Sequence, residues 1–288
     1  MSYGETAMQE NYSKLLTYSY NIVGSYEDAK DLVQDVIEKY ISLDKSSIRD
    51  EYNYLVKSTI NHSINFKNRQ TKKEIFGEWL PEPVSFESPD IKLIKEQTAG
   101  YTMMVLLEKL NPKERAVFIL KEGFDYQHAE IGELLDITQE NSRQLLSRAN
   151  KTLNDAKFQP RKPTSIQLET LKKYQMVLCD ANITELEKLL VTDVKLTADG
   201  GKQIRVVKAI EIGVANTATL LSYVQHQFLS NKEFSLHNLN HQPCICFWEN
   251  QRLYNCHILD IDSNGRIQNI FSIVDPTKLK NLHKLSRS

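Results

Sequence analysis

The sequence predicts a multi-domain chain in which two all-α domains, a helical bundle and a helix-turn-helix domain, precede an α+β domain. Apolar residues recur with helical period up to about residue 158, whereas alternating strand patterns dominate after residue 233. Two proline-containing segments without such periods, beginning at Trp79 and Pro160, separate these parts. The expected domains are residues 1–75, a linker over 76–100, residues 101–158 and residues 165–288.

Composition indicates a soluble globular protein, since 41% of the residues are apolar and 25% are charged. No apolar run approaches the roughly 20 residues that a membrane span needs. The first ten residues are polar and acidic, unlike a secretory signal. We therefore expect a cytoplasmic protein without a membrane partner.

The first domain begins with a helix that ends at Gly24. Ser25 is expected to cap a second helix, with Asp28 as its capping-box partner. A third helix follows, with Val56, Ile60 and neighbouring residues facing inward. The apolar stripe of the second helix contains Ala29, Leu32, Val33, Val36, Ile37, Tyr40 and Ile41.

The second domain shows the pattern of a helix-turn-helix. A helix is predicted to start at Asn111, and a short helix over 127–135 leads into a turn at Asp136. Thr138 then caps a longer helix to about residue 155. Its inner face carries Ser142, Leu145, Leu146 and Ala149, which leaves Arg143, Gln144, Ser147, Arg148 and Lys151 facing outward.

The third domain is predicted to run from helices into an antiparallel meander. The helices are expected over 165–179, 183–190 and 207–229, and the strands over 233–239, 243–248, 252–262 and 266–274. Asn264 and Gly265, between two alternating runs, predict a two-residue hairpin.

The distribution of charge is more informative than the formal net charge of −1. Residues 57–73 hold five basic side chains and no acid, and residues 141–162 hold six basic side chains and one acid. By contrast, residues 27–38 hold five acids and one lysine. Two basic stripes and one acidic stripe suggest two DNA contacts and one protein contact, although a charge run alone is usually a solvated face.

Residues 24–35, GSYEDAKDLVQD, resemble the most recognisable segment of extracytoplasmic-function (ECF) sigma factors. In that family this helix docks on the β′ clamp helices of core RNA polymerase. An acidic and amide face on a rigid helix offers acceptors to a basic partner. The resemblance implies polymerase binding by Asp28, Asp31, Gln34 and Asp35.

The third helix lies where this family reads the minus-ten promoter element. An asparagine amide offers a donor and an acceptor to a base edge, and lysine and arginine neutralise phosphates. The family usually has Asp where Asn65 stands, and a richer arginine tail. The implied DNA-binding residues of this helix are Asn61, Asn65, Lys67 and Arg69.

Residues 110–118, LNPKERAVF, resemble the start of the family's second conserved domain. The resemblance implies that its helix-turn-helix binds the minus-thirty-five element and that core polymerase contacts include the β flap. The expected contacts are the outward residues Arg143, Gln144, Ser147, Arg148 and Lys151.

Three further motifs resemble those of the ECF subgroup with a SnoaL-like C-terminal cone. They are Trp79-Leu80-Pro81-Glu82-Pro83, Asp199-Gly200-Gly201 with Lys202 in place of a third glycine, and Asp275-Pro276-Thr277-Lys278-Leu279 with Asp in place of Asn. The first motif is too apolar to lie in water, so we expect it to pack near residues 199–201 or 275–279 and to regulate activity. The resemblance also implies a pocket that could take an unknown small ligand.

The leading interpretation is an alternative sigma factor, modulated by its C-terminal domain, with no chemistry and no cofactor of its own. One alternative is a helix-turn-helix transcriptional regulator with a ligand-sensing domain, which leaves the acidic helix unexplained. Another is an enzyme, for which His226, His237, His241 and His257 are candidates without any catalytic signature. Cys244, Cys246, Cys256 and His257 could be imagined as metal ligands, but reduced core cysteines are favoured.

Overall fold

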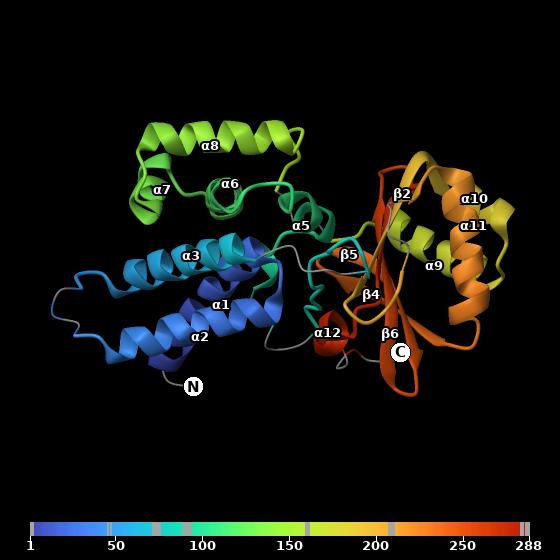
Figure 1. The fold of residues 1–288 in the computed structure, drawn as a ribbon, viewed down its shortest axis with the longest axis horizontal. Coiled ribbons are helices and arrows are strands. Elements are labelled where there is room, and N and C mark those ends of the chain that lie inside the picture. The colour runs from blue at the N-terminus through green and yellow to red at the C-terminus, as the bar shows by residue number, and fades with distance from the viewer. Residues whose placement is uncertain are drawn as a thin grey trace. The chain divides into compact units, whose positions relative to one another are not determined.

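The computed structural model of the chain divides into two compact units (Figure 1). One unit contains residues Met1–Lys73 and Pro89–Pro160, and the other contains residues Glu74–Ser88 and Arg161–Ser288. The segment from Trp79 to Pro83 thus clusters with the C-terminal domain, while the predicted domain boundaries stay a prediction. The described residues are 3–44, 46, 48–70, 76–87, 91, 94–158, 162–206, 211–282 and 285.

The first unit begins with a three-helix bundle: α1 (Tyr3–Val23), α2 (Tyr26–Ser42) and α3 (Glu51–Arg69). α1 ends because Gly24 adopts a left-handed backbone, with φ of 82°. Ser25 then caps α2 by accepting a hydrogen bond of 3.2 Å from the N–H of Asp28. Tyr40 is buried, but Ile41 is 66% exposed, so its predicted inward position is wrong. Adjacent helical residues point about 100° apart, and Tyr40 takes the inward position.

The rest of the first unit is also helical: η2 (Lys95–Gln97), α5 (Tyr101–Leu107), α6 (Pro112–Phe118), the π-turn η3 (Ile119–Gly123), α7 (His128–Leu135) and α8 (Gln139–Thr152). α6 starts at a capping box formed by Asn111 and Glu114. Asp136, at the predicted turn between α7 and α8, has φ of 51°, a left-handed conformation that aspartate tolerates. A Cβ at Gly132 would lie 2.8 Å from the carbonyl oxygen of Ile137, so glycine permits the tight turn of this helix-turn-helix.

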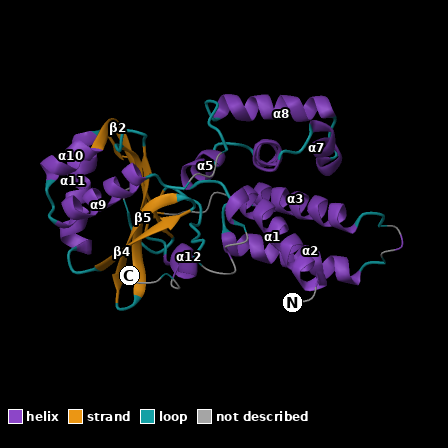
Figure 2. Ribbon diagram, turned by 180° about the vertical axis from the view of Figure 1, so that it is seen from behind, coloured by secondary structure: helices purple, strands orange, loops and turns teal. Residues whose placement is uncertain are grey.

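The second unit is an α+β domain. Its elements are β1 (Phe76–Gly77), α9 (Ser165–Cys179), α10 (Ile183–Leu189), β2 (Leu190–Gly201), β3 (Glu211–Ile212), α11 (Val214–Val224), the π-turn η4 (Gln225–Leu229), β4 (Glu233–Leu239), β5 (Gln242–Glu249), β6 (Arg252–Ile261), β7 (Ile267–Ile273), α12 (Pro276–Leu279) and η5 (Lys280–Leu282). The strands form a sheet in the order β1-β2-β7-β6-β5-β4, with β3 paired to β2. Figure 2 shows α9, α10 and α11 on one side of this sheet and α12 on the other.

Three predictions for this domain are wrong. β2 was not predicted, and it pairs in parallel with β7, so the sheet is mixed rather than a meander. The helix predicted over 207–229 starts at Val214, because β3 pairs with β2 and Gly213 has φ of 94°. The hairpin before β7 has a three-residue loop, since the N–H of Asp262 donates to the carbonyl of Arg266 across it. Gly265, with φ of 78°, closes a loop of this length.

Apolar side chains fill the space between the helices and the sheet. Leu171 and Leu178 of α9 and Leu221 of α11 pack with Ile245 and Leu259 of the strands. The predicted fold class, two all-α domains followed by an α+β cone, is confirmed. No helix within the described ranges is long and apolar enough to cross a membrane.

Candidate functional site

The acidic face of α2 lies at the surface, opposite the buried face of the same helix. Asp31, Gln34 and Asp35 are exposed, and Asp28 is half-buried at the first turn. Residues 28, 31 and 35 follow the i, i+3, i+7 spacing that places side chains on one side of a helix. The four side chains predicted to bind polymerase therefore form one rigid polar surface.

A groove of about 510 Å³ joins this acidic surface to α3. Asp28, Asp31 and Asp35 line one wall, and Asn65 and Arg69 line the other. The imidazole Nε2 of His62 lies 3.5 Å from the carboxylate of Asp35 across the groove. Two predicted DNA-binding residues therefore lie directly beside the predicted polymerase-binding surface.

The other two predicted DNA-binding residues of α3 are engaged within the first unit. Asn61 donates a hydrogen bond of 3.0 Å to the carbonyl of Leu134 in α7. Lys67 forms an ion pair of 2.8 Å with Glu108 and also donates to the carbonyl of Val23. Thus Asn65 and Arg69 are exposed, whereas Asn61 and Lys67 are half-buried. Lys72 and Lys73 of the same basic stripe lie outside the described residues.

α8 presents one buried face and one exposed basic face. Ser142, Leu145 and Ala149 are buried, and the Ser142 hydroxyl is hydrogen-bonded to His128 at 2.9 Å. Arg161, at the end of the second basic stripe, lies outside the described residues. All five residues predicted to face DNA are exposed: Arg143, Gln144, Ser147, Arg148 and Lys151.

In the second unit, Trp79 and Leu80 meet the two C-terminal motifs. The backbone N–H of Leu80 donates to Asp199 Oδ2 at 2.8 Å, and Leu80 is 1% exposed. Lys278 donates to the same carboxylate oxygen and to the carbonyl of Leu80. Its ammonium lies 4.2 Å from the centre of the Trp79 ring, a cation–π contact. The expected packing of the apolar motif on residues 199–201 and 275–279 is therefore present.

Asp275 and the glycines hold this contact in a tight arrangement. Asp199 Oδ1 accepts a hydrogen bond of 2.8 Å from the N–H of Gly201, and the Asp199 carbonyl accepts from the N–H of Asp275. A Cβ at Gly201, where φ is 58°, would lie 2.4 Å from the Asp275 carboxylate. At Gly200 it would lie 1.8 Å from the carbonyl oxygen of Ile204. The paired glycines therefore allow the chain to turn against Asp275.

Several residues that were not predicted extend this contact. Asn281 donates to Glu82 at 2.5 Å, and the Asn240 amide oxygen accepts from the N–H of Val84 at 2.8 Å. The ring of Phe86 packs against His241 with centroids 4.7 Å apart. Asn240 lies in a turn and has a positive φ of 43°. It meets the segment that follows the motif only through the folding of the chain. No local pattern marks these residues.

His237, His241 and His257 and the cysteines Cys244, Cys246 and Cys256 are buried in the cone, whereas His226 and Cys179 are exposed. Tyr174 is hydrogen-bonded to His257 at 2.9 Å, and burial lowers the pKa of His257 to about 4. Burial also lowers the pKa of His237, although Glu87 opposes the shift. Burial raises the pKa of the Cys244 thiol, which lies 3.8 Å from the Cys246 sulfur. Within the described part of the chain, no cluster of three His, Cys, Asp or Glu side chains could hold a metal ion.

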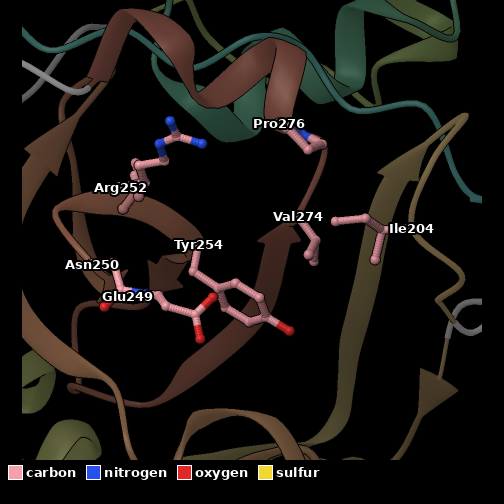
Figure 3. A pocket seen from close by; sticks show the side chains of 8 residues that line it. Ile204, Glu249, Asn250, Arg252, Tyr254, Val274 and Pro276 are labelled. Atoms are coloured by element: carbon pink, nitrogen blue, oxygen red, sulfur yellow. The ribbon is translucent and has the colours of Figure 1, made fainter.

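A cavity of about 500 Å³ opens beside the glycine motif and the start of α12. Tyr254 and Leu253 of β6 contribute one part of its wall, and Ile204 and Val274 contribute another. Figure 3 shows Tyr254, Ile204 and Val274 arranged around one space, with Arg252 and Glu249 at its polar side. Glu249 is paired with Lys232 at 2.5 Å. Pro276 completes the lining, so the cavity borders the segment that carries Lys278.

Comparison with known proteins agrees with this geometry. The family described as Sigma-70, region 4 matches residues 102–153, which include α7 and α8. The chain is 28% identical to the ECF RNA polymerase sigma factor SigJ of Mycobacterium tuberculosis over 207 residues, 68% of this chain and 65% of SigJ. It is 22% identical to the probable ECF sigma factor SigI of the same species, over 95% of this chain and 93% of SigI. The crystal structure of SigJ superposes with a TM-score of 0.77 at 20% identity, covering 96% of this chain and 98% of SigJ.

The polar α2 surface and the basic helix-turn-helix occur in a chain whose residues 102–153 match the Sigma-70, region 4 family. Over most of its length the chain is similar to ECF sigma factors.

Proposed function

We propose that this protein directs promoter-specific transcription initiation as a subunit of RNA polymerase. It would bind the core enzyme through the β′ clamp helices and the β flap, and act in the cytoplasm, where transcription takes place. The observation that carries the proposal is the exposed acidic face of α2, with Asp31 and Asp35, in the same unit as an exposed basic α8. A DNA-binding repressor needs a basic helix such as α8, but it does not need an acidic face such as that of α2.

The two helical domains would divide promoter recognition between them. Residues 1–75 would read the minus-ten element through α3, and residues 101–158 would read the minus-thirty-five element through α8. Asn65 and Arg69 are exposed and available for the first task. The basic face of α8 suits phosphate and major-groove contacts. The protein would take no part in covalent chemistry.

Run-off transcription with core polymerase and genomic promoters tests this proposal. We expect defined transcripts that need both core enzyme and this protein. Co-purification separates the alternatives, because a helix-turn-helix repressor with a ligand-sensing domain would bind promoter DNA without binding core. Absence of both core binding and transcripts would contradict the proposal.

We propose that the SnoaL-like domain, residues 165–288, modulates this activity through the contact among Trp79, Leu80, Asp199 and Lys278. The contact fixes the segment that joins the two helical domains in the sequence. Pro81, Glu82 and Pro83 are buried as well, so releasing this segment would expose a stretch of apolar surface. Modulation would therefore be a change between a docked and a released segment.

We further propose that the cavity beside α12 takes a small organic anion with an apolar or aromatic body. Glu249 is neutralised by Lys232, which leaves Arg252 to bind an anion, and Tyr254 offers an aromatic wall. Titration with anilinonaphthalene sulfonate tests the site. Arg252→Gln should weaken binding, whereas Lys195→Gln, an exposed control on β2, should not. Equal binding by both variants would place the dye elsewhere.

A further inference from the structure

The cavity beside α12 has two walls that are held in place by different parts of the second unit. One wall comes from the hairpin of β5 and β6 and contains Glu249, Arg252 and Tyr254. We call it the hairpin wall. Glu249 pairs with Arg252, and Trp248 pairs with Leu253, across these two strands. The hairpin wall is therefore supported by the sheet itself.

The second wall of the cavity, which we call the motif wall, consists of Ile204, Val274 and Pro276. The N–H of Ile204 donates to the carbonyl of Gly200 at 3.0 Å, and the N–H of Val274 donates to the carbonyl of Asp199 at 2.8 Å. Pro276 is the first residue of α12. The motif wall is therefore positioned by the turn at Asp199 and Gly200 and by α12.

The same turn and the same helix hold the docked segment, Trp79–Pro83. Asp199 Oδ2 accepts a hydrogen bond of 2.8 Å from the N–H of Leu80 and another from the ammonium of Lys278 in α12. That ammonium also reaches the carbonyl of Leu80 and the ring of Trp79. Because Asp199 is fully buried, loss of Leu80 leaves its carboxylate short of a partner. Release of the segment should therefore let the turn, α12 and the motif wall rearrange.

A ligand that spans the cavity would bind the docked and the released states with different affinities. It would reach Arg252 on the hairpin wall in both states. It would contact the motif wall fully only while the docked segment keeps that wall in place. A ligand shifts an equilibrium between two states by the difference in its affinity for them. An occupied cavity should therefore favour the docked segment.

We propose that the cavity is an effector site, and that a small organic anion bound there holds the segment Trp79–Pro83 in its docked position. The inference rests on the proposed cavity ligand and the proposed modulation, and it adds the coupling between them. Coupling is reciprocal, so the factor by which docking raises affinity for the anion equals the factor by which saturating anion suppresses release. We expect a factor of about five, the low end of couplings between sites in proteins.

Hydrogen exchange of the full chain, with and without anilinonaphthalene sulfonate, measures release of the segment. The N–H of Leu80 donates to buried Asp199, so it exchanges when the segment is released. At saturating dye, exchange of a peptide over residues 78–86 should slow about fivefold. A peptide over α9, which does not line the cavity, reports any general stabilisation and should slow less. Arg252→Gln should remove the effect of the dye on residues 78–86.

Leu80→Asp tests the coupling from the other end. A second carboxylate beside Asp199 would be an unpaired buried charge, so this variant should keep the segment released. Dye affinity should then fall about fivefold, the same factor as in the exchange experiment. Met176→Asp adds the same charge to α9, at a side chain that is 60% exposed, and should leave dye affinity unchanged. Affinity is taken from the signal that Arg252→Gln abolishes, because a released segment exposes new apolar surface.

The outcomes separate the coupling from the proposals on which it rests. If dye binds through Arg252 but slows residues 78–86 no more than α9, the coupling is wrong and the cavity remains a binding site. If Arg252→Gln binds dye as well as the wild type, the proposed cavity site fails and the coupling fails with it. If Leu80→Asp does not fold by circular dichroism, exchange in the wild type decides the outcome. Run-off transcription tests the proposed role in initiation separately.

Discussion

Lys278 places its ammonium nitrogen 2.5 Å from carboxylate oxygen Oδ2 of Asp199, a residue 79 positions earlier in the sequence. The Asp199 side chain is fully buried and that of Lys278 is 10% exposed. The same ammonium also reaches the carbonyl of Leu80 and the ring of Trp79. One cation therefore connects three segments that are far apart in the chain.

Replacing Lys278 by methionine should destabilise the second unit by about 3 kcal/mol, because Asp199 would be left as an uncompensated buried charge. The melting temperature should fall by roughly 10 °C. Adding Asp199→Asn should recover part of the loss, since the pair would then be removed together. Lys280→Met, an exposed position two residues later, is the control in differential scanning calorimetry. Equal melting temperatures for Lys278→Met and Lys280→Met would show that the pair is not stabilising.

The variant Asp31→Lys/Asp35→Lys should abolish co-purification with core polymerase and leave the fold intact. Both side chains are exposed on α2, and the contact of Asp35 with His62 of α3 is at the surface, where it contributes little to the stability of the bundle. Two reversed charges facing a basic partner cost several kcal/mol, or at least about a 100-fold loss of affinity. Asp180→Lys/Asp193→Lys is a control of the same charge on exposed positions of the second unit. Undiminished binding to core would remove α2 from the polymerase interface.

Arg143→Ala and Arg148→Ala should each weaken binding to minus-thirty-five duplex DNA. A side chain that contacts a phosphate should reduce the slope of log affinity against log salt by about one. A side chain that contacts a base edge should instead lose affinity mainly at one promoter position. Fluorescence anisotropy titrations over a range of salt concentrations measure both effects, with exposed Lys113→Ala as the control. No change in either quantity would exclude α8 from the DNA interface.

Stability of the second unit should fall as pH drops from about 6.5 to about 4. Burial lowers the pKa of His257 to about 4, so the unfolded chain takes up this proton first. Each pH unit in this window should cost about 1.4 kcal/mol, or about 3 kcal/mol in total. Thermal unfolding at several pH values should show a flatter profile for His257→Gln than for exposed His226→Gln. Parallel profiles would mean that His257 is not buried as a neutral ring.

Trp79→Ala, removal of the chain after Pro163 and removal of the last segment from Asp275 should give different transcription rates. The substitution and the short deletion release the docked segment, because Lys278 or its aromatic partner is lost. The long deletion also removes the cavity and the sheet. Run-off transcription with the full chain and all three variants measures the difference. Identical initiation rates from one promoter would contradict regulation by the C-terminal domain.

Most of the helices and the faces that they expose could be predicted from the sequence alone, because both depend on local signals, although the helix predicted from residue 207 starts at Val214. The helix starts at Ser25 and Asn111 and the turn at Asp136 are set by neighbouring residues, and all three are present as predicted. The outward face of α8 follows from helical period, and its five basic or polar residues are exposed. The motif resemblance identified the sigma-factor class, which similarity to SigJ supports.

Only the tertiary structure decided which of these residues meet. β2 was missed because a strand that pairs in parallel with the distant β7 carries no local turn signal. The sharing of Glu108 by Lys67 and Arg115, and of Asp199 by Leu80 and Lys278, joins residues far apart in sequence. Local pattern fixes the direction in which a side chain points from its own helix or strand. Its partner is fixed by the packing of elements that are distant in the chain, and this packing decides which predicted DNA-binding residues are exposed.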